Sequence, residues 1–272
     1  MLLTDLRPRR TLSLQTSSKT VGIFFAASLL LSTSHARATI VSVNAGTNGT
    51  TGWTFSNTSG DSNQNGSFTG AAGATTMGTS WGLYANSGQT ASMTYSFASA
   101  LLTATGSSTL PVGGTVQIQL SLGNVNTGGT VGIALQNNSG TNRFETYYIG
   151  SDPTDAFKLN DAGGQENITG PNTTFAASNW PTNIDYQTIL FTQLVGNTYS
   201  LEFDGLSVTN TDLTLVASDI SQIRFFNFNA GAGNNQYANN LVVVPEPGSF
   251  MIIGAGLALA SLRRLTSKRR AA

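Results

Sequence analysis

Alternation of apolar and polar residues in the middle of the chain is the feature that most constrains its fold. The run TVQIQLSL, residues 115–122, places its four large aliphatic residues on one face, and TVGIAL, residues 130–135, repeats the pattern. Because successive side chains of a strand point to opposite faces, each run predicts a strand with one buried face. The connection GNVNTGG is rich in residues that tolerate positive φ. Together the two runs predict one antiparallel pair.

Further short runs with a period of two continue to residue 244, separated by clusters of Gly, Asn, Ser and Thr. Gly196-Asn197 between two of them is a hairpin signal. No sustained helical spacing is found between residues 39 and 244. The sequence therefore predicts an all-β fold of about ten short strands, a two-sheet antiparallel sandwich of the jelly-roll type found in many lectins and carbohydrate-binding modules. The additional strands are expected at 91–97, 143–149, 186–194, 198–203, 220–228 and 240–244.

Charge is distributed unevenly along the chain. Thirteen basic and thirteen acidic residues balance overall, but residues 39–244 hold three basic against eleven acidic residues, a net charge of −8. Such a body lacks the basic surface that binds nucleic acid or anionic lipid. The chain has no cysteine and one histidine, His35, which lies in the leader described below. We therefore expect no Ser–His or Cys–His nucleophile and no imidazole or thiolate zinc site in the mature domain.

The first 38 residues have the organisation of a secretory signal peptide. Basic residues precede the apolar run 21–31, and Ala36-Arg37-Ala38 then forms an A-x-A cleavage site. The apolar run is too short for a stable membrane anchor. We expect an N-terminal signal helix, cleavage by signal peptidase after Ala38 and a mature chain that begins near Thr39.

The last 28 residues form three consecutive segments. Pro245-Glu246-Pro247 ends the final predicted strand, since proline cannot donate to a β-ladder. Residues 248–262 contain no charge and would form a short apolar helix about 22 Å long, against about 30 Å of bilayer hydrocarbon. This run spans a membrane only if flanking cations snorkel or the bilayer thins. A basic tail follows that should remain cytoplasmic, consisting of Arg263, Arg264, Lys268, Arg269 and Arg270.

The order of proline motif, apolar run and basic tail resembles the PEP-CTERM sorting signal, which is also labelled the ice-binding protein C-terminal domain. The resemblance covers only about the last thirty residues. It implies an exported protein of a Gram-negative bacterium whose tail is recognised by an exosortase, a membrane transpeptidase, and removed near Pro245-Glu246-Pro247. The protein would be anchored transiently in the membrane and would reach the cell surface or the extracellular space. The alternative is a permanent C-terminal anchor.

Two segments carry the oxygen ligands that calcium prefers, and calcium is the one cofactor that the sequence suggests. In DSNQNGSFTGAA, Asp61, Asn63 and Asn65 occupy positions 1, 3 and 5 of a calcium loop, but Ala72 stands where the loop needs a bidentate carboxylate. The second segment, residues 150–166, groups Asp152, Asp155, Asp161 and Glu166. The alternative for both segments is a set of solvated turns.

Glu202 and Asp204 are the candidates for a catalytic carboxylate pair. At positions i and i+2 of a predicted strand they would share one face, and EFDG resembles the start of the E-x-D-x-x-E motif of jelly-roll glucanases. Residue 207 is Ser where that motif has its second Glu. Because glycoside hydrolysis needs two carboxylates in distinct roles, we expect no catalysis.

Aromatic side chains offer a way to bind sugars instead. Trp53 and Trp81 lie in alternating segments, where burial in the core is expected. Trp180, in the loop ASNWPTN, is the residue expected to be exposed and to contact a glycan. Threonine-rich stretches such as 208–216 are too irregular for the flat repeat of an ice-binding surface.

The sequence thus predicts a signal peptide at 1–38, a β-sandwich domain at 39–244 and a sorting signal at 245–272. The favoured function is that of an exported, non-catalytic protein of the cell surface or extracellular matrix, structural or adhesive and associated with exopolysaccharide. The alternative is a calcium-supported carbohydrate-binding module. A jelly-roll glycosidase and an ice-binding protein are less favoured.

Overall fold

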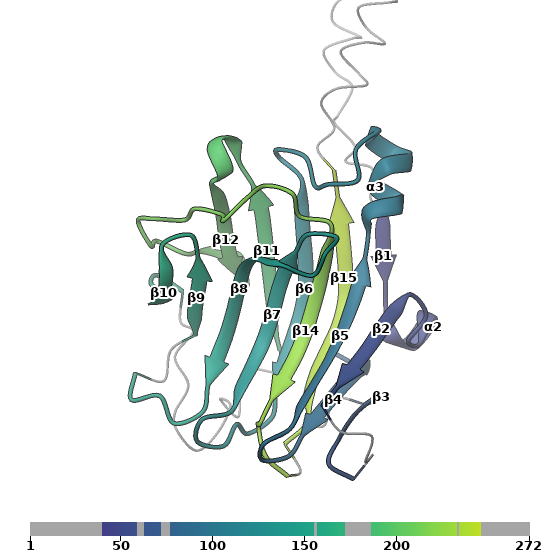
Figure 1. Cartoon of the computed structure of the whole chain (residues 1–272), viewed down its shortest axis with the longest axis vertical. Coiled ribbons are helices and arrows are strands. Elements are labelled where there is room, and N and C mark those ends of the chain that lie inside the picture. Colours follow the sequence, from purple (N-terminus) through teal and green to yellow (C-terminus); the bar gives the residue numbers. More distant parts are fainter. Residues whose placement is uncertain are drawn as a thin grey trace, which may run out of the picture. The chain divides into compact units, whose positions relative to one another are not determined.

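Two antiparallel β-sheets face each other in the computed structural model of the chain (Figure 1). The structure describes residues 40–58, 63–71, 77–154, 157–171, 186–232 and 234–245. One sheet, called here the β15 sheet, has the order β13-β12-β11-β6-β15-β4-β3, with β1 also paired to β15. The other, the β14 sheet, has the order β10-β9-β8-β7-β14-β5-β2. The predicted jelly-roll sandwich of two sheets is confirmed.

The described strands and helices are short. The β15 sheet contains β1 (Val41–Val43), β3 (Asn65–Ala71), β4 (Thr79–Ala85), β6 (Thr115–Leu122), β11 (Gln187–Gln193), β12 (Tyr199–Phe203), β13 (Leu206–Ser207) and β15 (Gln236–Val244). The β14 sheet contains β2 (Trp53–Asn57), β5 (Thr90–Ser96), β7 (Thr130–Gln136), β8 (Asn142–Ile149), β9 (Lys158–Asp161), β10 (Gly164–Asn167) and β14 (Gln222–Phe228). Helices α2 (Ala45–Asn48) and α3 (Ala98–Thr105) and the 3-10 turn η1 (Val195–Asn197) complete the set.

The core lies between the inner faces of the two sheets. Phe144 of β8 and Phe191 of β11 meet there with ring centroids 5.4 Å apart, and both are buried. Phe157 and Phe203 form a second contact, with centroids 5.5 Å apart. Full burial of a side chain of this size stabilises the fold by about 1.5–3 kcal/mol. The alternating positions of β6 and β7 point into this core, as the sequence predicts.

Strands β6 and β7 are the two runs that the sequence pattern predicts to pair with each other. That prediction is wrong, because β6 pairs with β11 and β15, whereas β7 pairs with β8 and β14. Their connection, residues 123–129, crosses between sheets that lie about 10 Å apart. Each run buries one face because the two strands lie on opposite sides of the core.

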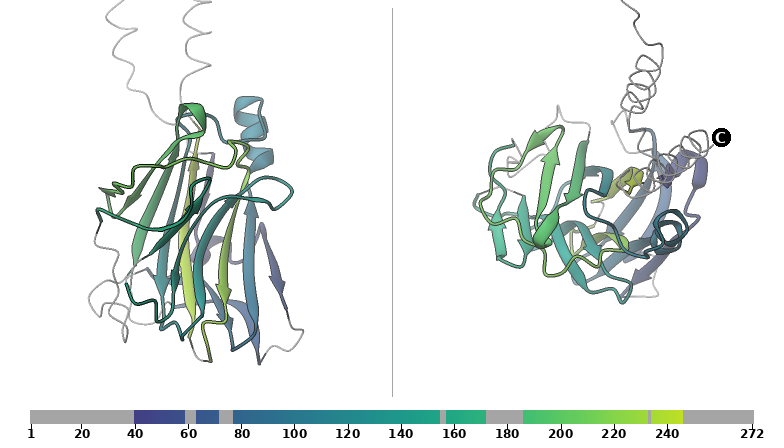
Figure 2. Two further views of the ribbon diagram at one scale, coloured as in Figure 1. Left: turned by 60° about the vertical axis from the view of Figure 1, so that its left-hand side comes forward. Right: turned by 90° about the horizontal axis from the view of Figure 1, so that it is seen from above.

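The last two described strands, β14 and β15, occupy central positions in their sheets (Figure 2). β14 lies between β7 and β5. β15 has β6 along one side and, along the other, first β4 and then β1. The change of partner coincides with a bulge between Asn239 and Val242, where Asn240 has a φ of 49°. Asn240 thus adopts a left-handed backbone, which occurs at some bulges and which asparagine tolerates.

Asn239 ties this irregular part of β15 to two neighbouring segments. Its buried side chain accepts a hydrogen bond from the backbone N–H of Ala45, with an N–O distance of 2.9 Å. Its amide nitrogen donates to the carbonyls of Met77 at 3.0 Å and Thr79 at 2.9 Å. One side chain therefore satisfies three backbone groups that the change of strand partner would leave unpaired.

Helix α3 departs from the expectation that no helix lies between residues 39 and 244. It buries a single residue, Leu101, and ends at Gly106, whose φ of 77° suits glycine and whose N–H donates to the Leu102 carbonyl. Two turns with one buried residue leave no detectable apolar period. Within the described ranges, none of the helices has the length and apolar character needed to cross a membrane.

The hairpin predicted at Gly196-Asn197 is confirmed. Both residues have positive φ, 70° and 62°, as a type I′ turn requires, and they join β11 to β12. A second turn of this kind, at Asp204-Gly205 with φ of 51° and 79°, joins β12 to β13. The sequence pattern places Asp204 within a strand, and that placement is wrong because Asp-Gly is itself a hairpin signal.

Candidate functional site

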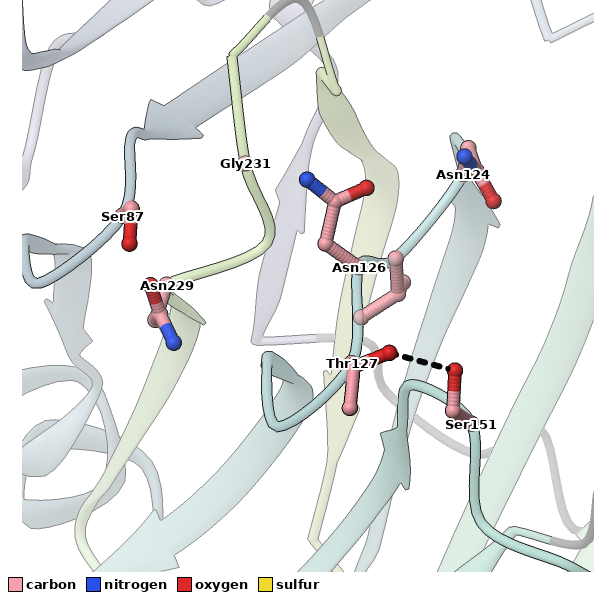
Figure 3. Close-up of a pocket in the computed structure, with 8 residues that line it drawn as sticks. Ser87, Asn124, Asn126, Thr127, Ser151, Asn229 and Gly231 are labelled. Carbon is pink, nitrogen blue, oxygen red and sulfur yellow. Dashed lines mark hydrogen bonds between the residues drawn. The ribbon is translucent and has the colours of Figure 1, made fainter.

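A polar pocket with a volume of about 440 Å³ lies at the end of the sandwich where β14 finishes and β15 begins (Figure 3). Four connections meet there: the β4–β5 turn, the β6–β7 crossing, the segment after β8 and the β14–β15 loop. The lining residues that the structure describes are uncharged, and they are Ser87, Asn124, Val125, Asn126, Thr127, Ser151, Asn229 and Gly231.

The β14–β15 loop closes against the β6–β7 crossing to form one wall of the pocket. Asn126 N–H donates to the Ala230 carbonyl at 2.8 Å, and Asn234 Nδ2 donates to Asn126 Oδ1 at 3.1 Å. Gly231, with a φ of 106°, is required here because a Cβ at this position would collide with the Asn126 amide. The close approach of two loops thus fixes the orientation of the Asn126 side chain.

Two residues on the pocket wall have left-handed backbone conformations. Asn229 has a φ of 60°, and its Oδ1 accepts from Gly88 N–H at 2.7 Å, which holds the β4–β5 turn in place. Ser151 also has a φ of 60°, and its hydroxyl lies 2.8 Å from that of Thr127 (Figure 3). Serine rarely adopts this conformation, and such backbone is concentrated at binding and catalytic sites.

Amides and hydroxyls give the pocket a definite chemistry. Each amide offers two donors and an acceptor, and each hydroxyl is both donor and acceptor. An uncharged ligand that is itself covered with hydroxyl groups can match such a surface. Among the lining residues that the structure describes there is no carboxylate or cationic side chain.

Three aromatic rings form a patch on the outer face of the β15 sheet, called here the ring patch. Phe68 lies with its centroid 6.3 Å from that of Tyr84 and 5.8 Å from that of Tyr237. The rings of Phe68 and Tyr84 lie over Gly82 and Gly66, where any Cβ would collide with them. All three side chains are partly exposed.

The ring patch is close to the pocket. Tyr84 is three residues before Ser87, and the Tyr237 hydroxyl accepts from Asn235 Nδ2 at 3.3 Å. Gly123 N–H donates to the Asn235 carbonyl at 3.0 Å, next to Asn124 of the pocket wall. At about 3.3 Å per residue along a strand, the rings lie about 10 Å from the pocket, within the length of a short oligosaccharide.

The outer face of the β14 sheet carries an ion pair between Arg224 and Glu145. The Arg224 guanidinium donates to Glu145 Oε1 at 3.2 Å and lies 5.2 and 5.6 Å from the ring centroids of Phe226 and Phe228. Burial lowers the pKa of Arg224. Asn160 donates to the other Glu145 oxygen at 2.9 Å. With both carboxylate oxygens occupied, this cluster has the geometry of a structural network.

The first predicted calcium segment does not form a loop over its second half. Asn65 begins β3 and is buried, and its side chain accepts from Asn57 Nδ2 at 2.8 Å and donates to Gln89 at 3.2 Å. Asn63 precedes the strand and is exposed. Asp61 lies outside the described residues. The pairing of β3 with β4 therefore replaces the loop geometry that the calcium prediction assumed.

The second calcium segment is divided by a strand. Asp152 accepts from Thr154 N–H at 2.9 Å and pairs with Lys158 Nζ at 3.0 Å. The Thr154 and Lys158 hydrogen bonds lower the pKa of Asp152 to about 2. Asp161, at the far end of β9, accepts from the Tyr199 hydroxyl at 2.7 Å, and burial raises the pKa of that tyrosine.

The two carboxylates consequently do not converge on one point. Three residues of strand, about 10 Å, separate Asp161 from Lys158, the partner of Asp152. Asp155 lies outside the described residues. Among those that the structure covers, no three Asp, Glu, His or Cys side chains gather into a cluster that could hold a metal ion.

The carboxylates proposed as a catalytic pair do not share a strand face. Glu202 lies in β12, opposite Leu190 of β11. Asp204 lies beyond the strand, and its Oδ1 accepts from Thr188 N–H at 2.7 Å. The i, i+2 relation therefore does not place both side chains on the outer face, because the chain turns at Asp204-Gly205.

Two of the three tryptophans, Trp53 and Trp81, are among the described residues. Trp81 is fully buried, and Trp53 packs against it with ring centroids 4.8 Å apart, as expected for core residues. Trp180 lies outside the described residues. So do Ala36, Ala38, Glu246, Pro247 and the basic tail at 263–270. Pro245 is described and is buried directly after β15.

Comparison with protein-family models gives one match, the PEP-CTERM protein-sorting motif, over residues 243–265. The chain carries a PEP-CTERM sorting signal. The match begins within β15 and includes the proline motif, the apolar run and the first two arginines of the basic tail. A PEP-CTERM signal implies export to the cell surface or extracellular space and processing by an exosortase. It says nothing of the sandwich that precedes it.

Comparison with solved structures finds similarity to other sandwiches at low identity. The cellulose-induced protein Cip1 is 10% identical, with 75% of this chain and 96% of that one covered and a TM-score of 0.48. The carbohydrate-binding module CBM66 from Bacillus subtilis is 12% identical, with 70% and 94% covered and a TM-score of 0.40. The Bacillus licheniformis β-glucanase is 15% identical, with 72% and 92% covered and a TM-score of 0.41. No ligand or activity is transferred from them, and no curated protein matches the sequence.

The pocket was not predicted from the sequence. Its residues come from four connections spread between residues 87 and 231, and no local motif links them. Two segments of the sequence could have indicated the pocket, GNVNTGG at residues 123–129 and FNAGAGNN at residues 228–235. The first was interpreted only as a connection rich in turn residues. Both combine glycine with asparagine, which favours left-handed backbone at binding loops.

Proposed function

We propose that this is an exported, non-catalytic protein that binds a neutral polysaccharide of the extracellular matrix or cell surface. The pocket would hold a sugar unit through amide and hydroxyl groups, and the ring patch would stack against a neighbouring unit of the same chain. The sorting tail would anchor the protein in the membrane until an exosortase processes it. The domain would then act as an adhesive or structural component of the matrix.

The observation that carries this proposal is the chemistry of the pocket. Six of the eight described lining residues carry a side-chain amide or hydroxyl, and none of the eight is charged, which fits sugar hydroxyls better than an ionic ligand. The partly exposed rings of Phe68, Tyr84 and Tyr237 lie nearby. Aromatic rings with a few convergent polar groups are typical of small-molecule binding surfaces.

The position of the pocket also suits a matrix-binding role. The pocket is at the start of β15, and the sorting signal begins where β15 ends. Nine residues of strand separate the two by about 30 Å. A polysaccharide could thus be bound at one end of the domain while the other end is held by the tail.

The test is retention by the polysaccharide that the producing cells secrete, measured by affinity electrophoresis and supplemented with a panel of neutral glucans. Ser87→Tyr would fill the pocket from an exposed turn, and we expect affinity to fall at least about tenfold, corresponding to 1.4 kcal/mol. Ser139→Tyr, in the exposed β7–β8 turn at the opposite end, is the matched control and should bind normally.

Variants of the ring patch separate stacking from pocket binding. Tyr84→Ala and Tyr237→Ala should each weaken binding while leaving the melting temperature within a few degrees, because both rings lie on an outer face. Equal retention of Ser87→Tyr, Tyr237→Ala and the unmodified protein would contradict the proposed site. Release of reducing sugar from the bound polysaccharide would contradict the non-catalytic assignment.

A further inference from the structure

Exposed aliphatic side chains gather at the end of the sandwich opposite the pocket. Seven large hydrophobic residues among those described are exposed, and five of them belong to segments at this end. Val195, in the β11–β12 turn, has 71% of its surface exposed, and Leu102 of α3 has 55%. The five residues, called here the apolar end, are Leu102, Val112, Leu194, Val195 and Val216.

Hydrogen bonds hold most of these segments together. Gly113 N–H donates to the Gln193 carbonyl at 2.7 Å, which links the loop of Val112 to the β11–β12 turn. Leu215 N–H donates to the Asn197 carbonyl of the same turn, also at 2.7 Å. Figure 1 shows α3, the β11–β12 turn and the final residues of β15 at one end of the sheets.

Charged residues are missing from the segments that supply most of the apolar end. The sequence has no Asp, Glu, Lys or Arg between residues 62 and 142, which include α3 and the loop of Val112, and none between residues 186 and 201. Near Val216, Asp219 is neutralised by Arg143 at 2.5 Å. Asp212, four residues before Val216, is exposed and carries a charge of its own, whereas transfer of residues 98–112 and 194–197 to a less polar environment buries no charge from within them.

Both termini of the described domain leave at this end. Ile40 N–H donates to the Val243 carbonyl at 3.1 Å, so the first described residue lies beside the end of β15. Only residues 245–247 separate β15 from the uncharged run 248–262. At 3.8 Å for each Cα–Cα step, four steps reach at most about 15 Å.

This short connection limits where the domain can lie while the tail is in a bilayer. The headgroup region on each side of the hydrocarbon is about 5–8 Å thick. A domain tethered within about 15 Å of the hydrocarbon must therefore hold its tethered end at, or directly against, the headgroups. The exposed aliphatic residues of the apolar end lie at the same end of the sheets as that tether (Figure 1).

We propose that the apolar end is a membrane-docking surface, which inserts Leu102, Val195 and their neighbours among the lipid headgroups before the tail is processed. The inference rests on the proposed transient anchoring by the tail. It makes the lipid bilayer the partner of this end and directs the pocket away from the membrane. Processing of the tail removes the tether, and the remaining contact is small enough to release the domain.

The test uses the full chain, which has no cysteine of its own, so that single-cysteine variants can be labelled selectively. Leu102→Cys and Val195→Cys carry an environment-sensitive fluorophore at the apolar end. Leu206→Cys, an exposed leucine outside the apolar end, is the matched control, and Ala258→Cys reports insertion of the tail. Each labelled protein is reconstituted into phosphatidylethanolamine–phosphatidylglycerol vesicles with and without a headgroup-linked nitroxide quencher.

We expect the fluorophores at 102 and 195 to lose emission with the quencher and the one at 206 to keep it. Docking is refuted, and the proposed anchoring survives, if the fluorophore at 258 shows emission typical of hydrocarbon while those at 102 and 195 are quenched no more than the one at 206. If Ala258→Cys reports water, both are refuted. If light scattering detects a dimer without vesicles, and the fluorophores at 102 and 195 are shielded from water in it, this surface belongs to a contact with a second copy and docking is also refuted.

Discussion

Replacement of Asn239 by alanine tests whether one side chain holds the central part of the β15 sheet together. Asn239 is buried and makes three hydrogen bonds, to Ala45 N–H and to the carbonyls of Met77 and Thr79. Each such bond contributes about 1 kcal/mol net, and a buried group left unpaired costs about 1–3 kcal/mol. We therefore expect Asn239→Ala to lower the free energy of unfolding by about 3–5 kcal/mol.

The measurement is urea unfolding followed by tryptophan fluorescence, together with a thermal melt. For a domain of 150–250 residues, 1 kcal/mol corresponds to about 2–4 °C, so the melting temperature should fall by at least about 6 °C. Asn138→Ala, at an exposed asparagine in the β7–β8 turn, is the control and should change stability by less than about 0.5 kcal/mol. A loss below about 1 kcal/mol for Asn239→Ala, with an unchanged urea dependence, would refute this account of the β15 bulge.

Three further predictions concern acid stability, calcium and processing. Hydrogen bonds to Thr154 and Lys158 lower the pKa of Asp152 to about 2. The contribution of the ionised Asp152 to stability is therefore present above the unfolded-state pKa of about 3.9, and it is lost as the pH falls through about 2. Asp152→Asn should therefore destabilise the protein at pH 6 but not at pH 2, and a pH-independent difference would contradict this reading. If calcium binds the 61–72 or 150–166 segment, millimolar calcium should raise the melting temperature; no shift, with no calcium by elemental analysis, would exclude both sites. The intact mass of the exported protein should match a chain that begins near Thr39 and ends near Pro245, whereas an intact Met1 or Ala272 would contradict processing at that end.

The fold could be predicted to the level of its class and several of its strands. Residues 115–122 form β6 as predicted, because strict alternation reports directly which face of a strand is buried. Alternation does not report which strand lies alongside, so the pairing of β6 with β7 was predicted wrongly. A seven-residue connection suits a hairpin and a crossing between sheets equally well.

The missed strands have little of the composition that marks a strand. β3, NGSFTGA, resembles a calcium loop in sequence because it is rich in Asn, Gly and Ser, yet it pairs with β4, where the rings of Phe68 and Tyr84 lie over Gly82 and Gly66. β9 and β10, KLND and GQEN, are mostly polar. Such strands depend on tertiary context that local propensity does not contain.

The candidate site was beyond prediction for a related reason. Asn126, Ser151 and Asn229 are unremarkable turn residues in the sequence, and only the sheet topology brings them to one pocket. The sorting signal was predictable because its function depends on linear order alone, proline motif, apolar run and basic tail, which needs no folded context.

The position of β15 has a consequence for the order of events during export. This strand is the last that the structure describes, yet β6, β4 and β1 all pair with it. During export the β15 sheet therefore cannot close until residues 236–244 have been translocated, and with the anchoring proposed above the tail, a few residues behind, would by then be at the bilayer. Completion of the sandwich and arrival of the exosortase signal would then be nearly simultaneous, so that the processing enzyme would meet a domain that has only just become able to fold.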